Sequence, residues 1–357
     1  MGKEDYVLVN SFDLKEGMII AKDVFMGETK LLNKHTELNQ ALIEKLNNIF
    51  SYNSVPVILS SFSAYDDKIN DISEKTKFLE SEAIFESISA SVDEILFSLK
   101  FTSQPKLNNI REVSKNIVSN ITDYTNALKS ISNEREVDEY LVRHSVNVSV
   151  LSSMMGKWLN FSQKDITLLT YAGLLHDIGK TKLPQKILNK TSKLTKDEFD
   201  IVKKHPIIAY EIIKKIPYMD SSVSLAVLMH HERIDGSGYP LGLRSSNISN
   251  FGKIVGIADM YDAMTSNKVY AKKVSAFKAL DIMQKEHIDK LDSVYLNVFI
   301  QRISDYFTGE MVKLNNNSIG KIIKMDLNNI SKPLILVKEE FIDLKEREDL
   351  LIEDILN

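Results

Sequence analysis

The stretch Leu174–Lys180, with the sequence LLHDIGK, closes an apolar helical pattern with two potential metal ligands and a cation. His176 and Asp177 are adjacent, and Lys180 follows about one helical turn later. Imidazole nitrogens and carboxylate oxygens are common ligands of divalent metal ions, whereas a lysine ammonium suits an anionic group. The stretch therefore predicts a metal site beside a place where an anion binds.

Histidines are concentrated around this stretch. Five of the seven histidines in the chain lie between residues 144 and 231, and an aspartate follows within an apolar helical pattern. A single histidine on a helix usually has a structural role, but several ligand types at the ends of successive apolar helices can converge on one site. The candidate metal ligands are His144, His176, Asp177, His205, His230, His231 and Asp259.

The size of this set bears on the number of ions. One ion is satisfied by three or four protein ligands and water, so the set suits two divalent ions that share Asp177. The chain has no cysteine, so all ligands are nitrogen or oxygen. We expect two transition-metal ions, Fe or Mn in the first place, with Ni, Co and Zn left open. Such sites hydrolyse phosphate esters, and Lys180 would neutralise a phosphate oxygen.

The composition is that of a soluble globular protein. The chain has 357 residues, a length that suffices for two or three domains. Of these residues, 43% are hydrophobic and 26% are charged, which is ordinary for a globular protein. A net charge of −4 gives no overall basic surface, so nucleic acid is not an expected partner. The first residues lack the apolar run of a signal peptide, and no stretch is long enough for a membrane span, so we expect a cytoplasmic location.

The apolar periodicity predicts a mainly α-helical chain with four segments. Residues 1–65 combine β-branched runs with one helical stretch, which predicts a small α+β module. Residues 66–137 predict two helices that act as a connector or as the dimerising hairpin of a homodimer. Residues 138–310 predict the helical core with the metal ligands, and residues 311–357 a β-rich extension that ends in a short helix.

Several segments carry motifs beyond the histidines themselves. They are Asp138–Ser145, Gly173–Lys180, Lys204–Pro206, His230–Pro240 and Ile257–Thr265. Together these motifs resemble the HD-GYP subfamily of metal-dependent phosphohydrolases, whose members hydrolyse the bacterial messenger cyclic di-GMP. The Gly-Tyr-Pro loop separates this subfamily from other HD hydrolases. The resemblance covers nearly half of the chain and implies an HD-type helical bundle.

The resemblance also divides the candidate ligands between two metal ions. The first ion would be held by His144, His176, Asp177 and Asp259, and the second by Asp177, His205, His230 and His231. Lys180 would contact the scissile phosphate, and Asp138 would relay a proton near the attacking water or, equally well, cap a helix. The substrate contacts implied by the family are Lys180, Gly238, Tyr239, Pro240, Lys268 and Lys272. For Tyr239, packing beside the site is an alternative role that we slightly prefer.

Two departures from the family pattern matter. Some members bind a third metal ion through a glutamate four positions before the first histidine, where this chain has Tyr140, so a two-metal site is expected. The family commonly has Arg-Pro-Tyr-Arg where this chain has the residues from Lys268 to Ala271. Lysine lacks the planar fork of arginine and Ala271 carries no charge, so contacts to guanine and phosphate would weaken there unless Lys272 and Lys273 compensate.

The sequence thus predicts hydrolysis of cyclic di-GMP to linear pGpG, with further cleavage to GMP left open. One alternative is an HD phosphohydrolase of another nucleotide, since the changes at Lys268 and Ala271 can redirect the pocket. The other alternative is a catalytically weak receptor that binds cyclic di-GMP and passes a signal through the N-terminal module.

Overall fold

The computed structural model describes most of the chain and places it in two compact units. The units are Met1–Glu80 and Ser81–Asn357, and each is described below by itself. Asp138, Lys268, Ala271 and Lys272 lie outside the described residues, and the finer division into four segments stays a prediction. The described residues are 6–10, 14–26, 29–49, 54–58, 81–98, 107–120, 128, 140–266, 274–338 and 340–356.

The first unit contains two antiparallel strand pairs and one helix. Strand β1 (Tyr6–Asn10) pairs with β4 (Ser54–Ile58), and β2 (Val24–Met26) pairs with β3 (Thr29–Leu32). Helix α1 (Gln40–Ile49) is amphipathic, and its buried positions join a hydrophobic core that belongs to this unit alone. The predicted α+β character of this region is confirmed.

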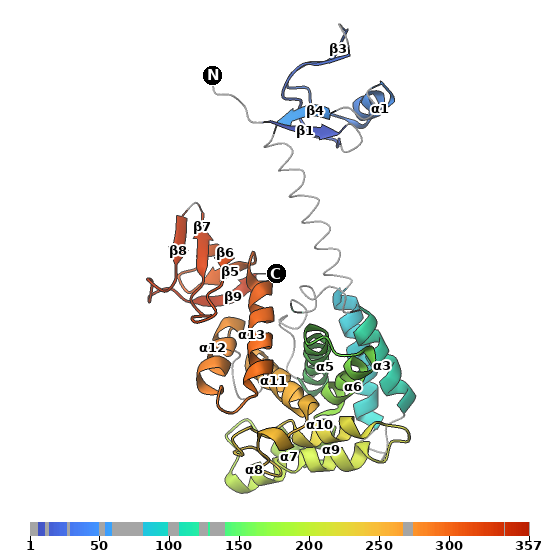
Figure 1. Ribbon diagram of the computed structural model, residues 1–357, viewed down its shortest axis with the longest axis vertical. Coiled ribbons are helices and arrows are strands. Elements are labelled where there is room, and N and C mark those ends of the chain that lie inside the picture. Colours follow the sequence, from blue (N-terminus) through green and yellow to red (C-terminus); the bar gives the residue numbers. More distant parts are fainter. Residues whose placement is uncertain are drawn as a thin grey trace. The chain divides into compact units, whose positions relative to one another are not determined.

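The second unit is built around a bundle of helices (Figure 1). Its main helices are α3 (Leu107–Asn120), α5 (Tyr140–Trp158), α6 (Gln163–Leu175), α9 (His205–Ile213), α10 (Ser221–Met229) and α11 (Asn250–Thr265). Residues 81–98 are helical as well. Helices α5 and α6 pack against each other and against α3 and α11, while α10 contacts α6, α9 and α11. The predicted helical class is therefore confirmed.

Short elements connect α6 to α9 along the chain. The 3₁₀ helix η3 (Ile178–Lys182) packs on α9, and α7 (Gln185–Leu188) contacts α8 (Lys196–Val202). Helix α8 begins with a capping box, in which Thr195 and Glu198 satisfy each other's backbone N–H groups. Helix α6 ends at Leu175, three residues earlier than its apolar pattern suggests, so the His-Asp pair lies just beyond the helix.

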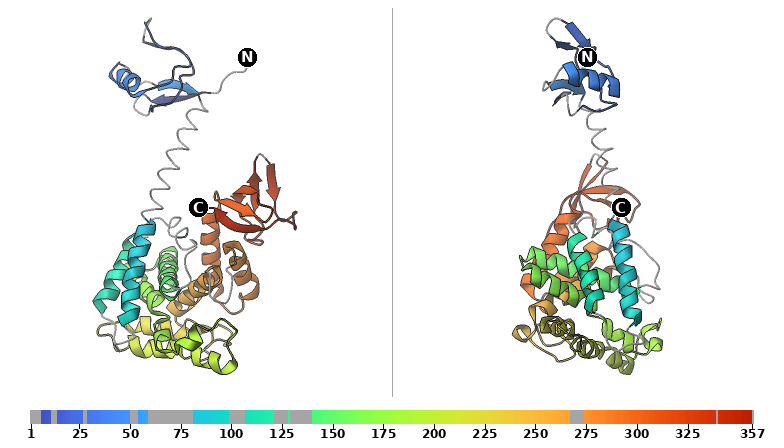
Figure 2. Two further views of the ribbon diagram at one scale, coloured as in Figure 1. Left: turned by 180° about the vertical axis from the view of Figure 1, so that it is seen from behind. Right: turned by 90° about the vertical axis from the view of Figure 1, so that its right-hand side faces the viewer.

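An antiparallel sheet follows α12 (Ala276–Glu286) and α13 (Ser293–Phe307), in the order β8-β7-β6-β5-β9. Both views in Figure 2 place it next to α13. Gln284 of α12 donates to the carbonyl of Leu327, and Ser331 donates to Asp281, so the β6–β7 connection is tied to α12. The strands are β5 (Met311–Leu314), β6 (Ile319–Lys324), β7 (Leu334–Val337), β8 (Glu340–Asp343) and β9 (Ile352–Leu356).

The sheet corrects one expectation for the chain end. The tail was expected to close in a short helix, but residues 352–356 form β9 and pair with β5. Tertiary pairing decides the structure here, because the apolar positions of a short segment fit a strand edge as well as a helical turn. The predicted β-rich character of the extension is confirmed.

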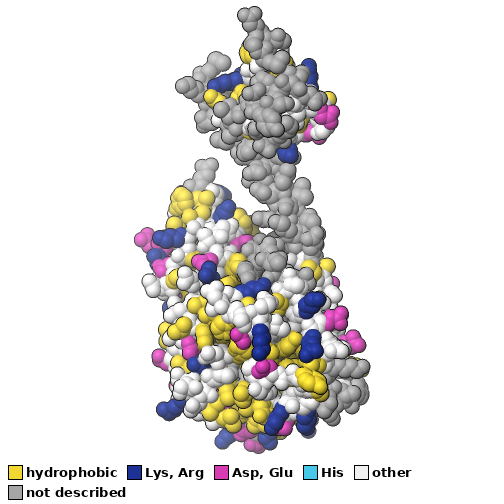
Figure 3. All heavy atoms as spheres, turned by 45° about the vertical axis from the view of Figure 1, so that its right-hand side comes forward, with side chains coloured by type: hydrophobic (Ala, Val, Ile, Leu, Met, Phe, Trp, Pro, Cys, Tyr) yellow, Lys and Arg dark blue, Asp and Glu magenta, His cyan; other side chains and the backbone are white. Residues whose placement is uncertain are grey.

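The surface of the second unit is mixed in character. On the face shown in Figure 3, basic side chains lie among acidic and apolar ones rather than in one continuous patch. Within the described residues, no helix has both the length and the apolar character that crossing a membrane requires.

Truncation of one core aromatic tests whether the sheet and the helices share a single core. Phe277 of α12 is 1% exposed and joins the cluster that contains helix and sheet residues. We expect Phe277→Ala to lower the free energy of unfolding by about 3–5 kcal/mol, since it leaves a cavity. Urea unfolding followed by the emission of Trp158, the only tryptophan, measures this unit alone.

The matched control is Phe341→Ala, because Phe341 is 66% exposed on β8. Its unfolding free energy should stay within about 0.5 kcal/mol of the parent protein. An equal loss in both variants would show that burial of Phe277 in a common core is not what stabilises the unit.

Candidate metal centre

The candidate ligands come from five helices that converge on one place. His144 lies in the first turn of α5, His176 caps the end of α6, and His205 begins α9. A Cβ at Gly179 would collide with the carbonyl oxygen of His205, so glycine lets η3 press directly on α9. This close approach brings Asp177, which precedes η3, against the start of α9.

The structure brings all seven predicted ligands together in two groups. Within each group, one donor atom per residue lies within 4.8 Å of the donor atoms of the others. The first group comprises His144, His176 and Asp259, and the second comprises Asp177, His205, His230 and His231.

Asp177 stands between these groups. Its Oδ2 lies 3.5 Å from Nε2 of His144 and 3.5 Å from Nε2 of His176, while its Oδ1 lies 3.2 Å from Nε2 of His205. The carboxylate therefore turns one oxygen to each group, and it is only 1% exposed. This is the arrangement expected of a carboxylate that bridges two cations.

Three histidines use helix ends to fix their tautomer. Each lies just beyond the last turn of a helix and donates its Nδ1–H to a carbonyl of that turn, which has no partner within the helix. The bonds run from His176 to Gly173 at 2.8 Å, from His205 to Val202 at 2.8 Å, and from His230 to Val227 at 2.6 Å. Each Nε2 is therefore the nitrogen with the lone pair, and each points into the site.

The protonation of the second group favours a bound cation. Burial lowers the pKa of His230 and of His231 well below the ordinary histidine value, so both rings are neutral. Burial opposes the ionised form of Asp177, but the ammonium of Lys180 and the ring of His176 hold the pKa of this carboxyl well below its usual range. The group thus combines a carboxylate with neutral imidazoles.

Direct contacts test whether a divalent ion fits. Nε2 of His205 and Nε2 of His230 are 3.4 Å apart, and Nδ1 of each ring is already bonded to a backbone carbonyl. Oδ1 of Asp177 is buried and has no hydrogen-bond donor among the described residues, because its neighbour Nε2 of His205 is the unprotonated nitrogen. Facing acceptor atoms without a proton between them are stabilised by a cation, so the donor set fits a divalent metal.

The first group is held by a second carboxylate. Nδ1 of His144 donates to Asp262 at 2.6 Å, and Nε2 lies 3.1 Å from Asp259. Burial lowers the pKa of His144, but hydrogen bonds to these two aspartates outweigh it and raise the pKa to about 9. Nε2 of His144 also lies 3.1 Å from Nε2 of His176, so a metal ion would take the place of the imidazolium proton.

Lys180 lies at the open side of the site. Its Nζ is 2.5 Å from Oδ2 of Asp177, and its side chain is 22% exposed. The side chains of His231 and Asp259 are 16% and 11% exposed, whereas those of His176 and His205 are fully buried. A phosphate that enters from this side would meet the lysine beside the ligands.

The Gly-Tyr-Pro loop is anchored to the turn that carries His231. Glu232 is buried and accepts the backbone N–H groups of Leu241 at 2.7 Å and Leu243 at 2.8 Å. A Cβ at Gly238 would lie 2.5 Å from the Cα of Glu232, so only glycine allows this approach. The peptide bond that precedes Pro240 is cis.

Tyr239 packs on the ligands themselves. Its ring centroid lies 4.6 Å from that of His231 at an interplanar angle of 32°, and its N–H donates to the carbonyl of His231. The tyrosine thus supports the ligand ring, which agrees with the preferred packing role. Asp138, Lys268 and Lys272 fall outside the described residues, so their predicted roles stay predictions.

Sequence reasoning missed the residues that position the ligands. Asp262 is fully buried and accepts from both His144 and Asn147, the latter at 2.6 Å. The signal in the sequence is the spacing of Asp259 and Asp262, which lie one turn apart on α11 and so face the same side. Glu232 was visible only as a neighbour of the histidine pair.

Asp262→Asn tests the positioning of His144. An amide accepts more weakly than a carboxylate and does not favour the same tautomer, so we expect metal affinity to fall by about 10–100-fold. Elemental analysis after dialysis against a competing chelator measures the loss, and far-UV circular dichroism reports the helices.

The matched control is Asp281→Asn, a buried carboxylate of α12 that bonds to Lys285 and Ser331 instead. Its metal content should equal that of the parent protein. If both variants lost metal equally, Asp262 would have no specific role at the site.

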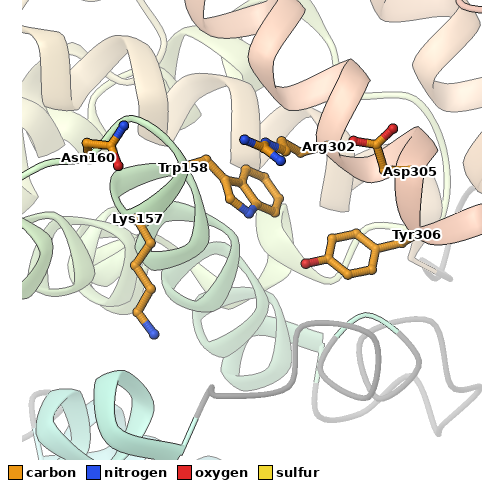
Figure 4. Close-up of a pocket in the computed structure, with 6 residues that line it drawn as sticks. All are labelled: Lys157, Trp158, Asn160, Arg302, Asp305 and Tyr306. Atoms are coloured by element: carbon orange, nitrogen blue, oxygen red, sulfur yellow. The ribbon is translucent and has the colours of Figure 1, made fainter.

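A separate hollow lies at the other end of α5 (Figure 4). It has a volume of about 380 Å³, and Trp158 and Tyr306 contribute aromatic walls to it. Since His144 is in the first turn of α5 and Trp158 is its last residue, the helix rise separates them by roughly 20 Å. The hollow is therefore not part of the metal centre.

The class of the helical unit follows from its match to a known family. Residues 121–294 match the family described as HD domain, a match that includes every candidate ligand. The solved structure of an HDG"Y"P protein from Bdellovibrio bacteriovorus aligns with a TM-score of 0.53 at 18% identity, over 84% of this chain and 99% of that one. At this identity the likeness concerns the fold alone, and the fold is that of an HD domain.

The curated relatives narrow the class. A cyclic di-GMP phosphodiesterase of Pseudomonas aeruginosa is 33% identical over 221 residues, which cover 62% of this chain and 53% of that protein. A second one, from Borreliella burgdorferi, is 36% identical over 196 residues and covers 55% and 52%. A Vibrio cholerae relative, 31% identical over 170 residues that cover 47% and 39%, is named a 3′3′-cGAMP-specific phosphodiesterase.

The chain spans about half the length of the first two relatives. The HD-domain match at residues 121–294 includes the HD motif, the histidine pair and the Gly-Tyr-Pro loop, so this region of the chain is an HD domain that carries the motifs of the HD-GYP subfamily.

Proposed function

We propose that this protein hydrolyses cyclic di-GMP at a centre of two divalent metal ions and releases linear pGpG. The observation that carries the proposal is the placement of Asp177, whose two oxygens face imidazole nitrogens of two separate ligand groups. Relatives named cyclic di-GMP phosphodiesterases support the substrate. We take Fe or Mn as the metals to test first; nitrogen and oxygen donors without sulfur also suit Ni, Co and Zn.

Each side chain at the proposed centre has its own role in hydrolysis. When bound, two ions supply the Lewis-acid chemistry that phosphate-ester hydrolysis requires. Asp177 holds the two groups of ligands in register, and Lys180 on the open side neutralises a non-bridging phosphate oxygen as charge develops. Asp138 is proposed as the proton relay, and Lys268 and Lys272 as cations that contact the nucleotide. Gly238 and Pro240 shape the loop that keeps Tyr239 beside the ligands.

A specific finding favours a second substrate. A Vibrio cholerae relative that is 31% identical over 170 residues is named a 3′3′-cGAMP-specific phosphodiesterase, so a cyclic dinucleotide with one adenine is the first alternative. A receptor without turnover is less well supported, since all seven ligands are present and converge. A homodimer and a cytoplasmic location stay predictions.

A chromatographic time course tests the proposal directly. The purified protein with added Mn²⁺ is incubated in parallel with cyclic di-GMP, 3′3′-cGAMP, cyclic di-AMP and linear pGpG. We expect cyclic di-GMP to be consumed first and linear pGpG to accumulate. Preferred loss of 3′3′-cGAMP would establish the alternative substrate, and tight binding without turnover of any of them would contradict the enzymatic role.

The double variant His176→Ala/Asp177→Ala links turnover to the metal centre. It removes the bridging carboxylate and one imidazole, so we expect activity to fall below detection and the metal content to drop with it. Far-UV circular dichroism should retain its helical signal. Turnover equal to that of the parent protein would place the reaction elsewhere.

Lys180→Met separates phosphate stabilisation from metal binding. Loss of one cation at the developing charge should lower kcat by about 10²–10³-fold, while metal content stays within about twofold. Lys180→Arg should recover part of the activity, because it keeps the charge. Lys186→Met, at an exposed position of α7, serves as the control and should retain full activity. Equal kcat values for Lys180→Met and the control would remove Lys180 from the mechanism.

A further inference from the structure

Aromatic rings follow one another outward from the candidate ligand His231. His231 is the most exposed of the ligand side chains for which a contact is described, at 16%, and the ring of Tyr239 covers it at a centroid distance of 4.6 Å. Beyond Tyr239 lies Phe199, with 6.3 Å between the ring centroids and an interplanar angle of 77°. His231, Tyr239 and Phe199 therefore form an aromatic row that leads from the ligands to the rim.

Phe199 is the exposed end of this row. It lies on α8, and its residue surface is 43% exposed. Single exposed apolar residues are common on protein surfaces and need no explanation by themselves. Phe199 differs from such residues because its ring contacts the side chain that packs on a metal ligand.

Helix α8 holds Phe199 firmly in place. Thr195 and Glu198 form the capping box of α8, and Glu198 also accepts from Lys190 at 2.6 Å. These contacts tie the start of the helix to the segment before it. An exposed aromatic ring on an anchored element keeps its orientation when a ligand arrives, so little conformational entropy is lost on binding.

A cation accompanies the ring. Nζ of Lys203 lies 4.8 Å from the ring centroid of Phe199, and it also bonds to Asp200 at 3.0 Å. The ammonium lies over the ring of Phe199, whose residue surface is still 43% exposed, and an aromatic ring with an ammonium suits a purine base, which offers a π-face and ring-nitrogen or carbonyl acceptors. Guanine has two such acceptors on one edge, O6 and N7.

We propose that Phe199, with Lys203 beside it, is the stacking seat for one purine base of the nucleotide whose phosphate binds at the metal centre. This inference rests on the proposed function, because it requires a nucleotide phosphate at the ligands. The row places Phe199 one aromatic ring beyond His231, as a purine lies one ribose beyond its phosphate. A base in this seat orients the phosphodiester toward Lys180 and the ligands.

Packing between Phe199 and Tyr239 is the competing explanation. In that case Phe199 would only stabilise the Gly-Tyr-Pro loop. Its loss would then lower the affinity of the metal centre equally for every compound that binds there, with or without a base. Leucine distinguishes the two roles, because it keeps an apolar side chain against Tyr239 but offers no flat face for a base. Tryptophan keeps the flat face.

The experiment measures how tightly two compounds bind to the 357-residue, Mn²⁺-loaded protein, by isothermal titration calorimetry. Guanosine 5′-monophosphate carries a base, and inorganic phosphate does not. We expect Phe199→Leu to weaken binding of the monophosphate about tenfold and to change phosphate binding by less than about twofold. Phe199→Trp should bind the monophosphate at least as tightly as the parent protein. The matched control is Phe341→Leu, 66% exposed on β8, which should change neither ligand.

Three results would overturn the base seat. They are unchanged monophosphate binding in Phe199→Leu, an equal loss for both ligands, and no binding of the monophosphate by the parent protein. Turnover of cyclic di-GMP is read separately. If the protein shows no turnover but its affinity for the monophosphate depends on Phe199, the base-stacking proposal holds and the proposed enzymatic function fails. If the protein turns over cyclic di-GMP but Phe199→Leu leaves monophosphate binding unchanged, the enzymatic function holds and the base-stacking proposal fails.

Discussion

The structure of the metal centre depends on one buried carboxylate among imidazole lone pairs. Asp177 is 1% exposed, and its two oxygens face histidines of separate groups. Removing such a charge from water costs several kcal/mol unless cations or donors surround it. Lys180 contributes one positive charge, and divalent ions at the proposed centre would add to this compensation. The helical bundle can therefore be understood as a frame that holds this carboxylate in place.

Helix ends supply the rest of the frame. His176, His205 and His230 each donate Nδ1–H to a carbonyl of the turn before them, so the same bond satisfies the helix and selects the tautomer. Asp262 does the same for His144 from the interior of α11. Because the tautomers are set by backbone, small shifts in helix length would misdirect the lone pairs, which explains why the ligands follow helix ends so closely.

The candidate metal ligands could be predicted from the sequence because histidine and aspartate, which bind metals, recur at the ends of successive helices. Asp262 could not be found in this way, since its role lies in a contact with His144 across 118 positions of the chain. Residues 352–356 form a strand because they pair with the edge of β5. The local sequence of this segment does not show that such an edge is present. The residues that hold the ligands in position are thus harder to predict from the sequence than the ligands themselves.

The difference between the buried ligands and the more exposed residues near His231 bears on which substrate is chosen. In the proposed reaction, the fully buried candidate ligands His176 and His205 would act on any phosphodiester that reaches them. Selection between cyclic dinucleotides must come from groups that the bases reach, and these lie on the open side near His231 and Tyr239. Relatives with different named substrates are expected when the core is kept and the rim changes. Phe199 is exposed and contacts Tyr239, with Lys203 over its ring, so under the proposed function the substrate preference of this protein would depend on these residues rather than on the metal ligands.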